Sequence, residues 1–229
     1  MAFISRVAGY GGFRYTSRGL SHEVLRIKDG PLTLLIWSIL LPSIHAHIAP
    51  EAPERLDPET YRHDYRLAKG KFLVAEAGLN DPVFKKTVIL LFEYGSHGAA
   101  GLIINRPLHL KLADSVPGAA ESRRNDPLFF GGPVEPGNVW MLFRTEGEME
   151  GCGPVLPGVC VSTSEINLKK GMEAGLPSDS FRIYAGYAGW APSQLERELL
   201  RGGWHVMDAV PDAIFSPDPA KVWGELLPG

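Results

Sequence analysis

Apolar residues in this chain occur in short runs separated by glycine, proline and charged residues, and most runs have the length of a β-strand. Residues 87–94 (TVILLFEY) are nearly all apolar, which is typical of a strand buried on both faces. A hairpin turn at 95–98 (GSHG) leads to a strand at 99–107, which Pro107 ends because proline has no N–H for the strand ladder. Further strands are predicted at residues 71–77, 126–134, 138–144, 159–164, 180–187 and 204–210.

Short helices are predicted between and after the later strands, at residues 165–175, 193–201 and 220–227. Many strands mixed with a few short helices indicate the α+β class. From Leu67 to the C-terminus the composition does not change again and no repeat occurs, so residues 67–229 are expected to form a single domain. The chain has 229 residues, of which 45% are hydrophobic, and this is enough for one good core.

One apolar run, Pro31–Leu41 (PLTLLIWSILL), differs from the others because a basic flank precedes it and small residues follow it. It is too short to span a membrane, so no transmembrane segment is predicted. The pattern is that of a secretory signal peptide, with Ala46 as a tolerable cleavage position. A buried core strand is the alternative, but it would not explain the Pro-rich, charged segment that follows.

These features divide the chain into a signal-bearing extension (1–46), a linker (47–66) and the domain. The protein is therefore expected to be exported, most simply to the periplasm. The whole chain has 23 Lys and Arg against 26 Asp and Glu. Residues 1–46 hold five and two of these, which leaves 18 against 24 and a net charge of −6 for the remainder. Nucleic acid is an unlikely partner for such a domain, because cationic contacts to phosphate supply most of that affinity.

The segment Gly186–Ser193 (GYAGWAPS) raises the possibility of a site, because a strand, a glycine turn and a helix follow one another there. A phosphate loop would need a following lysine, and a nucleophile elbow would need Gly-x-Ser-x-Gly, and neither is present. Ser193 and Glu196 have the spacing of a capping box at a helix start. The segment is therefore predicted to be structural, with Ser193 as a cap, Glu196 and Glu198 facing solvent, and Trp190 as a core or surface plug.

Three segments carry a resemblance to a known family: 69–108 (KGKFLVAEAGLNDPVFKKTVILLFEYGSHGAAGLIINRPL), 129–134 (FFGGPV) and 184–206 (YAGYAGWAPSQLERELLRGGWHV). Together they resemble the YqgE/AlgH family of bacterial proteins, also known as UPF0301, over about Ala68 to Trp223. The resemblance implies a compact α+β fold with a bifurcated, partly barrel-like sheet and flanking helices. Members are often labelled transcriptional regulators, and many are cytoplasmic, which is the alternative location for this chain. This chain is similar to a subgroup that has a leader before the first strand.

The chain departs from the usual family pattern at three positions. The family commonly has histidine where Tyr94 and Phe143 stand here, and glycine where Ser193 stands. Any chemistry that depended on those histidines is therefore in doubt. None of the seven histidines has metal-ligand spacing with another histidine or with cysteine, so no metal site, cofactor or catalytic residue is predicted.

Two places remain as candidates for chemistry. Cys152 and Cys160 flank a Gly- and Pro-containing loop, and after export they could form a disulfide, although two reduced cysteines are equally compatible with the spacing. The second place consists of polar and glycine residues at the ends of two predicted strands, together with the tryptophan of the glycine turn. These residues could bind a small anion. A structural role, with the amide bracing a turn and the guanidinium paired to an acid, is the alternative. The proposed ligand-binding residues are Asn105, Arg106, Gly131, Gly132 and Trp190.

Three functions are compatible with these observations. A noncatalytic interaction or regulatory protein of the cell envelope, with a protein partner that the sequence does not identify, agrees best with the leader, the acidity and the lack of catalytic motifs. A small-anion binder or enzyme using the strand-end residues is the alternative. A DNA-binding regulator rests on the family label alone, and export and net charge argue against it.

Overall fold

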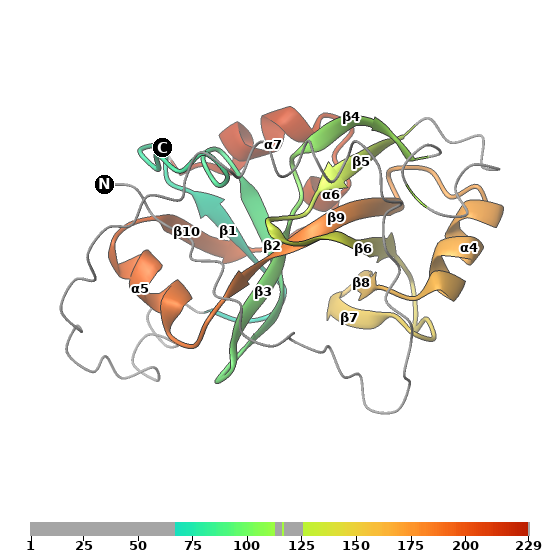
Figure 1. Cartoon of the computed structure of the whole chain (residues 1–229), viewed down its shortest axis with the longest axis horizontal. Coiled ribbons are helices and arrows are strands. Elements are labelled where there is room, and N and C mark those ends of the chain that lie inside the picture. The colour runs from blue at the N-terminus through green and yellow to red at the C-terminus, as the bar shows by residue number, and fades with distance from the viewer. Residues whose placement is uncertain (1–66, 113–115, 117–125, 229) are drawn as a thin grey trace.

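The computed structural model describes residues 67–112, 116 and 126–228, and the predicted leader and linker lie outside these residues (Figure 1). The described part contains ten β-strands and four short α-helices. In chain order, the elements are β1 (Lys71–Ala75), β2 (Val88–Gly95), β3 (Gly98–Ile103), β4 (Pro107–Lys111), β5 (Pro127–Phe130), β6 (Val134–Arg144), β7 (Gly153–Leu156), β8 (Val159–Ser162), α4 (Glu165–Glu173), β9 (Phe181–Trp190), α5 (Gln194–Leu200), β10 (Trp204–Asp208), α6 (Pro211–Ile214) and α7 (Pro219–Leu226).

The predicted strands and helices are confirmed in position, with small errors at their ends. The hairpin turn at 95–98 is confirmed by the pairing of Gly95 with Gly98, and residues 88–92 of β2 are buried as expected. The strand predicted at 99–107 was too long, because β3 ends at Ile103 and Pro107 begins β4 instead. Three elements were not predicted, namely β4, β7 and α6, each of which is no longer than five residues.

All ten strands belong to one sheet, and β9 is the strand at which this sheet divides. The main path has the order β10-β1-β2-β3-β9-β6-β8-β7, while β4 and β5 lie off it. One part of β9 pairs with β5 in parallel, through Phe129 and Tyr184, and a later part pairs with β3, through Ala99 and Trp190. Gly186 lies between these two pairings and has a φ of 66°. The glycine turn of the sequence is therefore the branch point of the sheet.

The sheet is also strongly curled, so that it forms a half-barrel. Gly70, immediately before β1, lies close to β7 at the other end of the sheet, since a Cβ added to Gly70 would be 2.9 Å from the Val155 carbonyl oxygen. The Gly70 backbone also accepts a hydrogen bond from the Ala209 N–H and donates one to the Leu91 carbonyl. Gly70 has a φ of 80°, which glycine adopts without steric cost. The first and last strands of the path are therefore brought together around this glycine.

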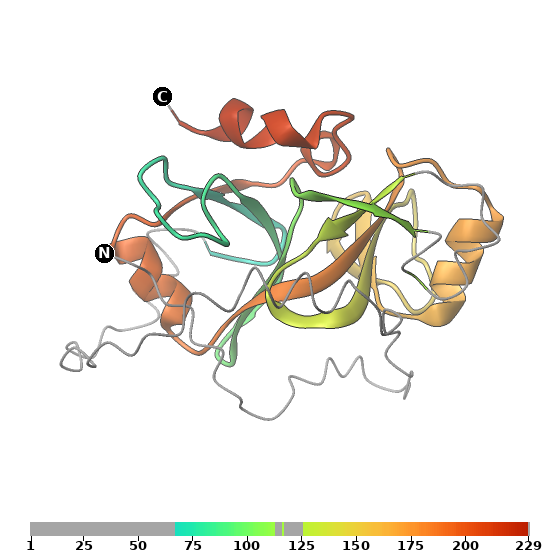
Figure 2. The ribbon, with the colours of Figure 1, turned by 45° about the horizontal axis from the view of Figure 1, so that its top comes forward.

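Short helices cover separate parts of the sheet (Figures 1 and 2). The segment α6–α7 lies across the upper side of the sheet in Figure 2, and Ile214, Phe215 and Val222 from it are buried with the residues of β1, β2 and β9. Helix α4 packs on a second apolar cluster through Leu168 and Met172. Helix α5 lies at the opposite end of the molecule from α4 and covers a third cluster. The architecture agrees with the α+β class predicted from the sequence and with the bifurcated, partly barrel-like sheet that the family resemblance implies.

Candidate functional site

Asn105 and Arg106 follow β3, and both hold the turn that precedes β2. The buried Asn105 side chain accepts a hydrogen bond from the Val88 N–H (2.9 Å) and donates one to the Lys86 carbonyl (3.0 Å). The Arg106 guanidinium donates to the Lys85 carbonyl (2.7 Å). Burial lowers the pKa of Arg106, and the nearby Asp81 carboxylate opposes this shift. Asn105 therefore braces a turn, as the structural alternative predicted, but Arg106 binds a backbone carbonyl rather than an acid.

The turn itself is built by local side-chain hydrogen bonds. One carboxylate oxygen of Asp81 accepts from the N–H groups of Val83 (2.8 Å) and Phe84 (2.9 Å). The Thr87 hydroxyl donates to the Phe84 carbonyl (2.7 Å). Because these groups fix residues 81–87, the two side chains from the end of β3 meet a defined backbone and not a loose loop.

Gly131 and Gly132 were predicted from the sequence to end a strand with exposed backbone N–H groups that could bind an anion, and the structure shows that these groups are not exposed. Both residues are buried, and the Gly131 N–H donates to the Ala185 carbonyl (2.8 Å). A Cβ on Gly132 would overlap the backbone of Tyr187, and a Cβ on Gly186 would overlap the Gly132 carbonyl oxygen. The two glycine motifs of the sequence thus pack backbone against backbone at the branch of the sheet. The close approach of these two backbone segments explains why glycine is needed at both places.

The predicted ligand-binding residues are brought together only in part. The Phe130 N–H donates to the Arg106 carbonyl and the Ile103 N–H donates to the Gly131 carbonyl, so the strand ends that carry Asn105 and Gly131 are neighbours. Trp190 pairs with Ala99, near the opposite end of β3. Trp190 therefore does not belong to the same cluster, and its role in binding stays an untested prediction.

Trp190 takes part in a separate polar cluster beneath α5. Its indole N–H donates to one carboxylate oxygen of Glu198 (2.9 Å), and the Trp204 indole donates to the same oxygen (3.0 Å). The Gln194 amide donates to the other oxygen (3.0 Å). Glu196 is buried and accepts from the Tyr94 hydroxyl (2.7 Å). The expectation that Glu196 and Glu198 face solvent was wrong, because both carboxylates anchor the helix to the sheet.

The predicted capping box at Ser193 is also wrong. Ser193 does stand at the N-cap of α5, but its side chain makes no capping hydrogen bond, and its backbone is left-handed with a φ of 61°. Glu196, the other half of the box, is engaged with Tyr94 instead. Left-handed backbone favours glycine, which accounts physically for the family's glycine at this position.

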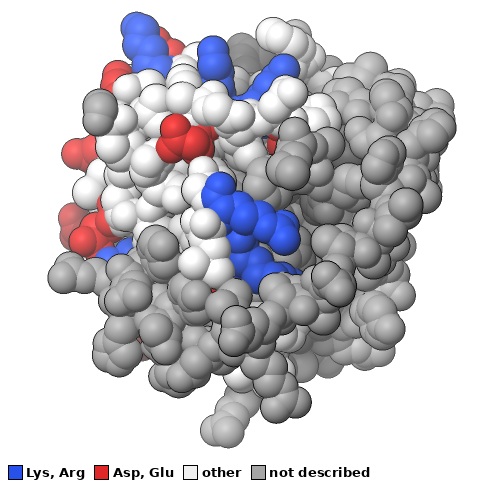
Figure 3. All heavy atoms as spheres, turned by 90° about the vertical axis from the view of Figure 1, so that its left-hand side faces the viewer, with Lys and Arg blue, Asp and Glu red and all other residues white. Residues whose placement is uncertain are grey.

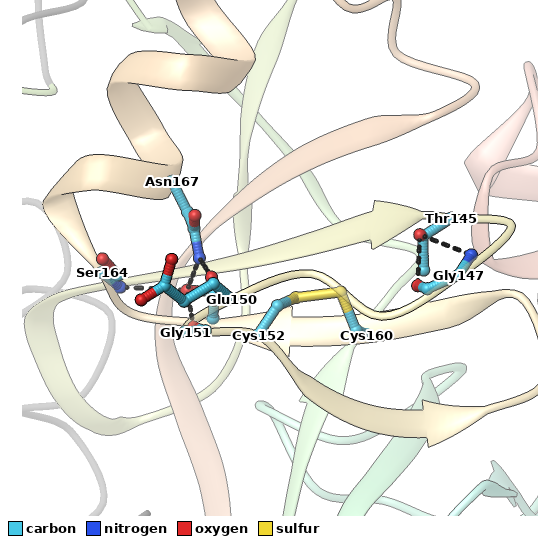
Figure 4. The surroundings of a disulfide bond; sticks show 9 residues. Thr145, Gly147, Glu150, Gly151, Cys152, Cys160, Ser164 and Asn167 are labelled. Carbon is cyan, nitrogen blue, oxygen red and sulfur yellow. Dashed lines mark hydrogen bonds between the residues drawn. A yellow bond between two sulfur atoms is a disulfide. The ribbon is translucent and has the colours of Figure 1, made fainter. Parts of the chain in front are cut away.

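Cys152 and Cys160 are joined by a disulfide in the structure, with their Cα atoms 5.6 Å apart (Figure 4). The bond ties the end of the loop before β7 to β8. The loop is held a second time by polar contacts, because the Ser162 hydroxyl donates to the Gly151 carbonyl (2.7 Å). The buried Asn167 amide of α4 donates to the Glu150 carbonyl (3.0 Å) and to the Ser162 hydroxyl (3.0 Å). A covalent bond and a hydrogen-bonded network therefore fix the same loop.

The sequence reasoning missed Arg182, the most deeply buried guanidinium among the described residues. Its side chain donates to the carbonyls of Ser178 (3.0 Å), Ile214 (2.9 Å) and Ser216, and it lies over the Phe129 ring at 4.7 Å from the centroid. Burial lowers its pKa. Arg182 thus fastens the segment around α6 to the sheet. Its charge inside an otherwise apolar strand (FRIY) was the available signal.

Groups that would hold a metal do not occur in the described ranges, where no three His, Cys, Asp or Glu side chains gather in a suitable cluster. None of the described helices is long and apolar enough to cross a membrane.

The fold and the braced strand ends define an α+β half-barrel protein with a divided sheet. Residues 72–228 match the model of the AlgH-like family, and the chain belongs to this family. It is 35% identical to a UPF0301 protein of Chlorobium luteolum over 163 residues, which are 71% of this chain and 85% of the relative. A UPF0301 protein of Chlorobaculum tepidum is 34% identical over 69% of this chain and 83% of its own length.

Two solved structures are similar. The AlgH protein of Pseudomonas aeruginosa has a TM-score of 0.57 and 30% identity, covering 75% of this chain and 89% of that one. A protein of Corynebacterium diphtheriae has a TM-score of 0.58 at 22% identity, covering 76% and 87%, and it supports the fold alone. The predicted family and the half-barrel are therefore confirmed.

Proposed function

We propose that this AlgH-like protein is a noncatalytic interaction or regulatory protein of the cell envelope. The observation that carries the proposal is that polar side chains suited to chemistry are engaged, among the described residues, in holding the fold. Asn105 braces a turn, Glu198 accepts from two indoles, and Arg182 binds three carbonyls. Reactive groups in active sites are instead aimed at the place that a substrate would occupy.

The Ser193 hydroxyl supports the same interpretation. It follows a strand and precedes a helix, as a nucleophile does in an elbow, yet no Gly-x-Ser-x-Gly frame surrounds it. A nucleophilic serine also needs a general base within hydrogen-bond reach. No hydrogen bond to the Ser193 side chain is found in the part of the chain that the structure describes.

The envelope part of the proposal rests on two independent features. The run Pro31–Leu41 with its basic flank has the pattern of a secretory signal. The Cys152–Cys160 bond is of a kind that persists in oxidising compartments and is rare in the cytosol. An exported protein with a net charge of −6 after residue 46 is poorly suited to act directly on a promoter.

The export step can be tested with a reporter that is active only in the periplasm, fused after residues 24–50. The wild-type segment is expected to give reporter activity. A matched fusion with Leu35→Arg and Ile36→Arg, which interrupts the apolar run, is expected to give none. Equal, cytosolic accumulation of both fusions without activity would contradict export.

The noncatalytic part is tested by labelling the purified protein with a fluorophosphonate probe, which reacts with activated serines. No labelled Ser193 peptide is expected, because no general base is hydrogen-bonded to the hydroxyl among the described residues. Labelling of Ser193 that a Ser193→Gly variant abolishes would overturn the proposal.

A further inference from the structure

Lys86 has an unusual backbone conformation for a lysine. Its φ is 56°, in the left-handed region that favours glycine and, less strongly, asparagine and aspartate. A glycine there would satisfy the turn without strain, so the fold alone does not call for a lysine side chain. Lys86 is exposed, and its ammonium group lies 5.4 Å from the centre of the Trp223 ring. Strained positions of this kind cluster at functional sites.

The strained turn is held by hydrogen bonds from Asn105 and Arg106, the two polar residues that follow β3. The Asn105 amide donates a hydrogen bond to the Lys86 carbonyl (3.0 Å), and the Arg106 guanidinium donates one to the Lys85 carbonyl (2.7 Å). Lys85 and Lys86 are both exposed, while Arg106 is partly buried. Two exposed lysines of one turn and the arginine that binds the backbone of that turn therefore lie in the same region, at one end of the sheet.

None of these three charges is neutralised by direct contact. In the described parts of the chain, no carboxylate forms an ion pair with Lys85, Lys86 or Arg106. Asp81 is near enough to favour the charged form of Arg106, but one of its carboxylate oxygens is occupied by two backbone N–H groups. A partly buried guanidinium without a carboxylate contact gains from an anion that takes the place of lost water.

We propose that Lys85, Lys86 and Arg106 form a binding site for a phosphate group, with Asn105 as a positioning residue. Phosphate suits this set because it offers several strong acceptor oxygens and negative charge to more than one cation at once. The phosphate can belong to a free phosphorylated molecule or to a lipid headgroup. This site goes beyond the proposed function and does not depend on it.

The location of the site is compatible with access from outside. Figure 1 places the segment between β1 and β2 next to α7 at the edge of the molecule. Figure 3, which views that side, shows Lys and Arg side chains both along the upper edge and near the centre of the face, with Asp and Glu side chains among those at the edge. Among the strand-end residues predicted from the sequence, only Arg106 would touch the ligand. Gly131 and Gly132 are buried in backbone contacts, and the Trp190 indole N–H is bound to Glu198.

The test uses the full chain and titrates inorganic phosphate by calorimetry, with chloride at matched ionic strength as the reference anion. Phosphate is expected to bind the wild type, and Lys85→Ala and Lys86→Gly are each expected to weaken binding by about tenfold or more. Lys86→Gly also relieves the strained backbone, so its thermal midpoint is expected to stay equal or rise. Loss of binding in that variant would therefore not be a folding defect. Lys170→Ala, on α4 at the far end of the molecule, is the charge-matched control and should bind as the wild type does.

A second measurement separates the two sources of the phosphate. Vesicles of phosphatidylglycerol in phosphatidylcholine are sedimented with the wild type and with the same variants. Binding that Lys85→Ala and Lys86→Gly remove, but Lys170→Ala does not, would identify a lipid headgroup as a source. The proposal is overturned if neither phosphate nor vesicles bind beyond the chloride reference, or if both site variants bind as the wild type does.

Discussion

Ser193 has a left-handed backbone, and this leads to a prediction that differs from that of a helix cap. Since its side chain caps nothing and its φ is 61°, Ser193→Gly should remove strain without loss of a hydrogen bond. We expect the free energy of unfolding to stay constant or rise by up to about 1 kcal/mol, because the strain that is relieved is partly offset by the entropy of glycine. Chemical denaturation measures this change.

Ser164→Gly is the matched control for that measurement, because Ser164 is also an N-cap but has an ordinary φ of −73°. This control should lose stability, since glycine gains nothing in extended backbone. A Ser193→Gly variant that loses as much stability as Ser164→Gly would show that the Ser193 side chain contributes a contact that the structure does not show.

Gly186 combines a positive φ with the close approach of a second backbone, and these two effects can be separated. Gly186→Ala should suffer both, because the added Cβ would overlap the Gly132 carbonyl oxygen as well as adopt a φ of 66°. Gly202→Ala has a similar φ of 70° but nothing within 4 Å of the added Cβ. We expect about 1–2 kcal/mol of lost stability for Gly202→Ala, and a clearly larger loss, or no folding, for Gly186→Ala. Equal losses in thermal unfolding would contradict the close approach.

At the scale of elements, the β7–β8 hairpin is tied by the Cys152–Cys160 bond, which closes a loop of eight sequence positions. In the chain-entropy model, a loop of this size stabilises the fold by roughly 2–3 kcal/mol. The double variant Cys152→Ala with Cys160→Ala should lose about this much. Reductant should lower the stability of the wild type to a similar level and leave the variant unchanged.

The state of the cysteines in the cell is tested by counting thiols on denatured protein from the native host, without reductant. No free thiols are expected, because an exported pair at a Cα distance of 5.6 Å oxidises readily. Two free thiols per chain would refute the bridge.

The elements differ in how well they could be predicted from the sequence. Strand β2 was predictable because an apolar run is a local signal, and the hairpin after it has its own turn residues. The short strands β4 and β7 each contain a proline, Pro107 and Pro154, so their pattern gave no strand signal. The helix pattern did not indicate that Glu198 faces inward. The two indole N–H groups that it binds belong to Trp190 and Trp204, which lie on two different strands.

The same limit applies to the candidate site. The sequence indicated Asn105 and Arg106 as polar residues at a strand end, and the structure does place them together. No feature of the sequence indicated that the two side chains would bind the backbone of Lys86 and Lys85, because these contacts join segments about 20 positions apart. The left-handed conformation of Lys86 also has no sequence signal, since lysine seldom adopts it.

At the scale of the whole molecule, we propose that this AlgH-like half-barrel works outside the cytoplasm as a noncatalytic partner of other molecules. The role outside the cytoplasm depends first on the compartment in which the protein is found. Export would make the disulfide stable, exclude direct action on a promoter, and bring the basic site within reach of phosphate groups in the envelope.

The most direct test is to determine the N-terminus of the mature protein by mass spectrometry after fractionating cells of the native host. We predict that the protein is found in the periplasmic fraction and that its first residue is His47, as cleavage after Ala46 requires. Protein that stays in the cytosolic fraction and still contains peptides from the Pro31–Leu41 run would contradict the envelope assignment.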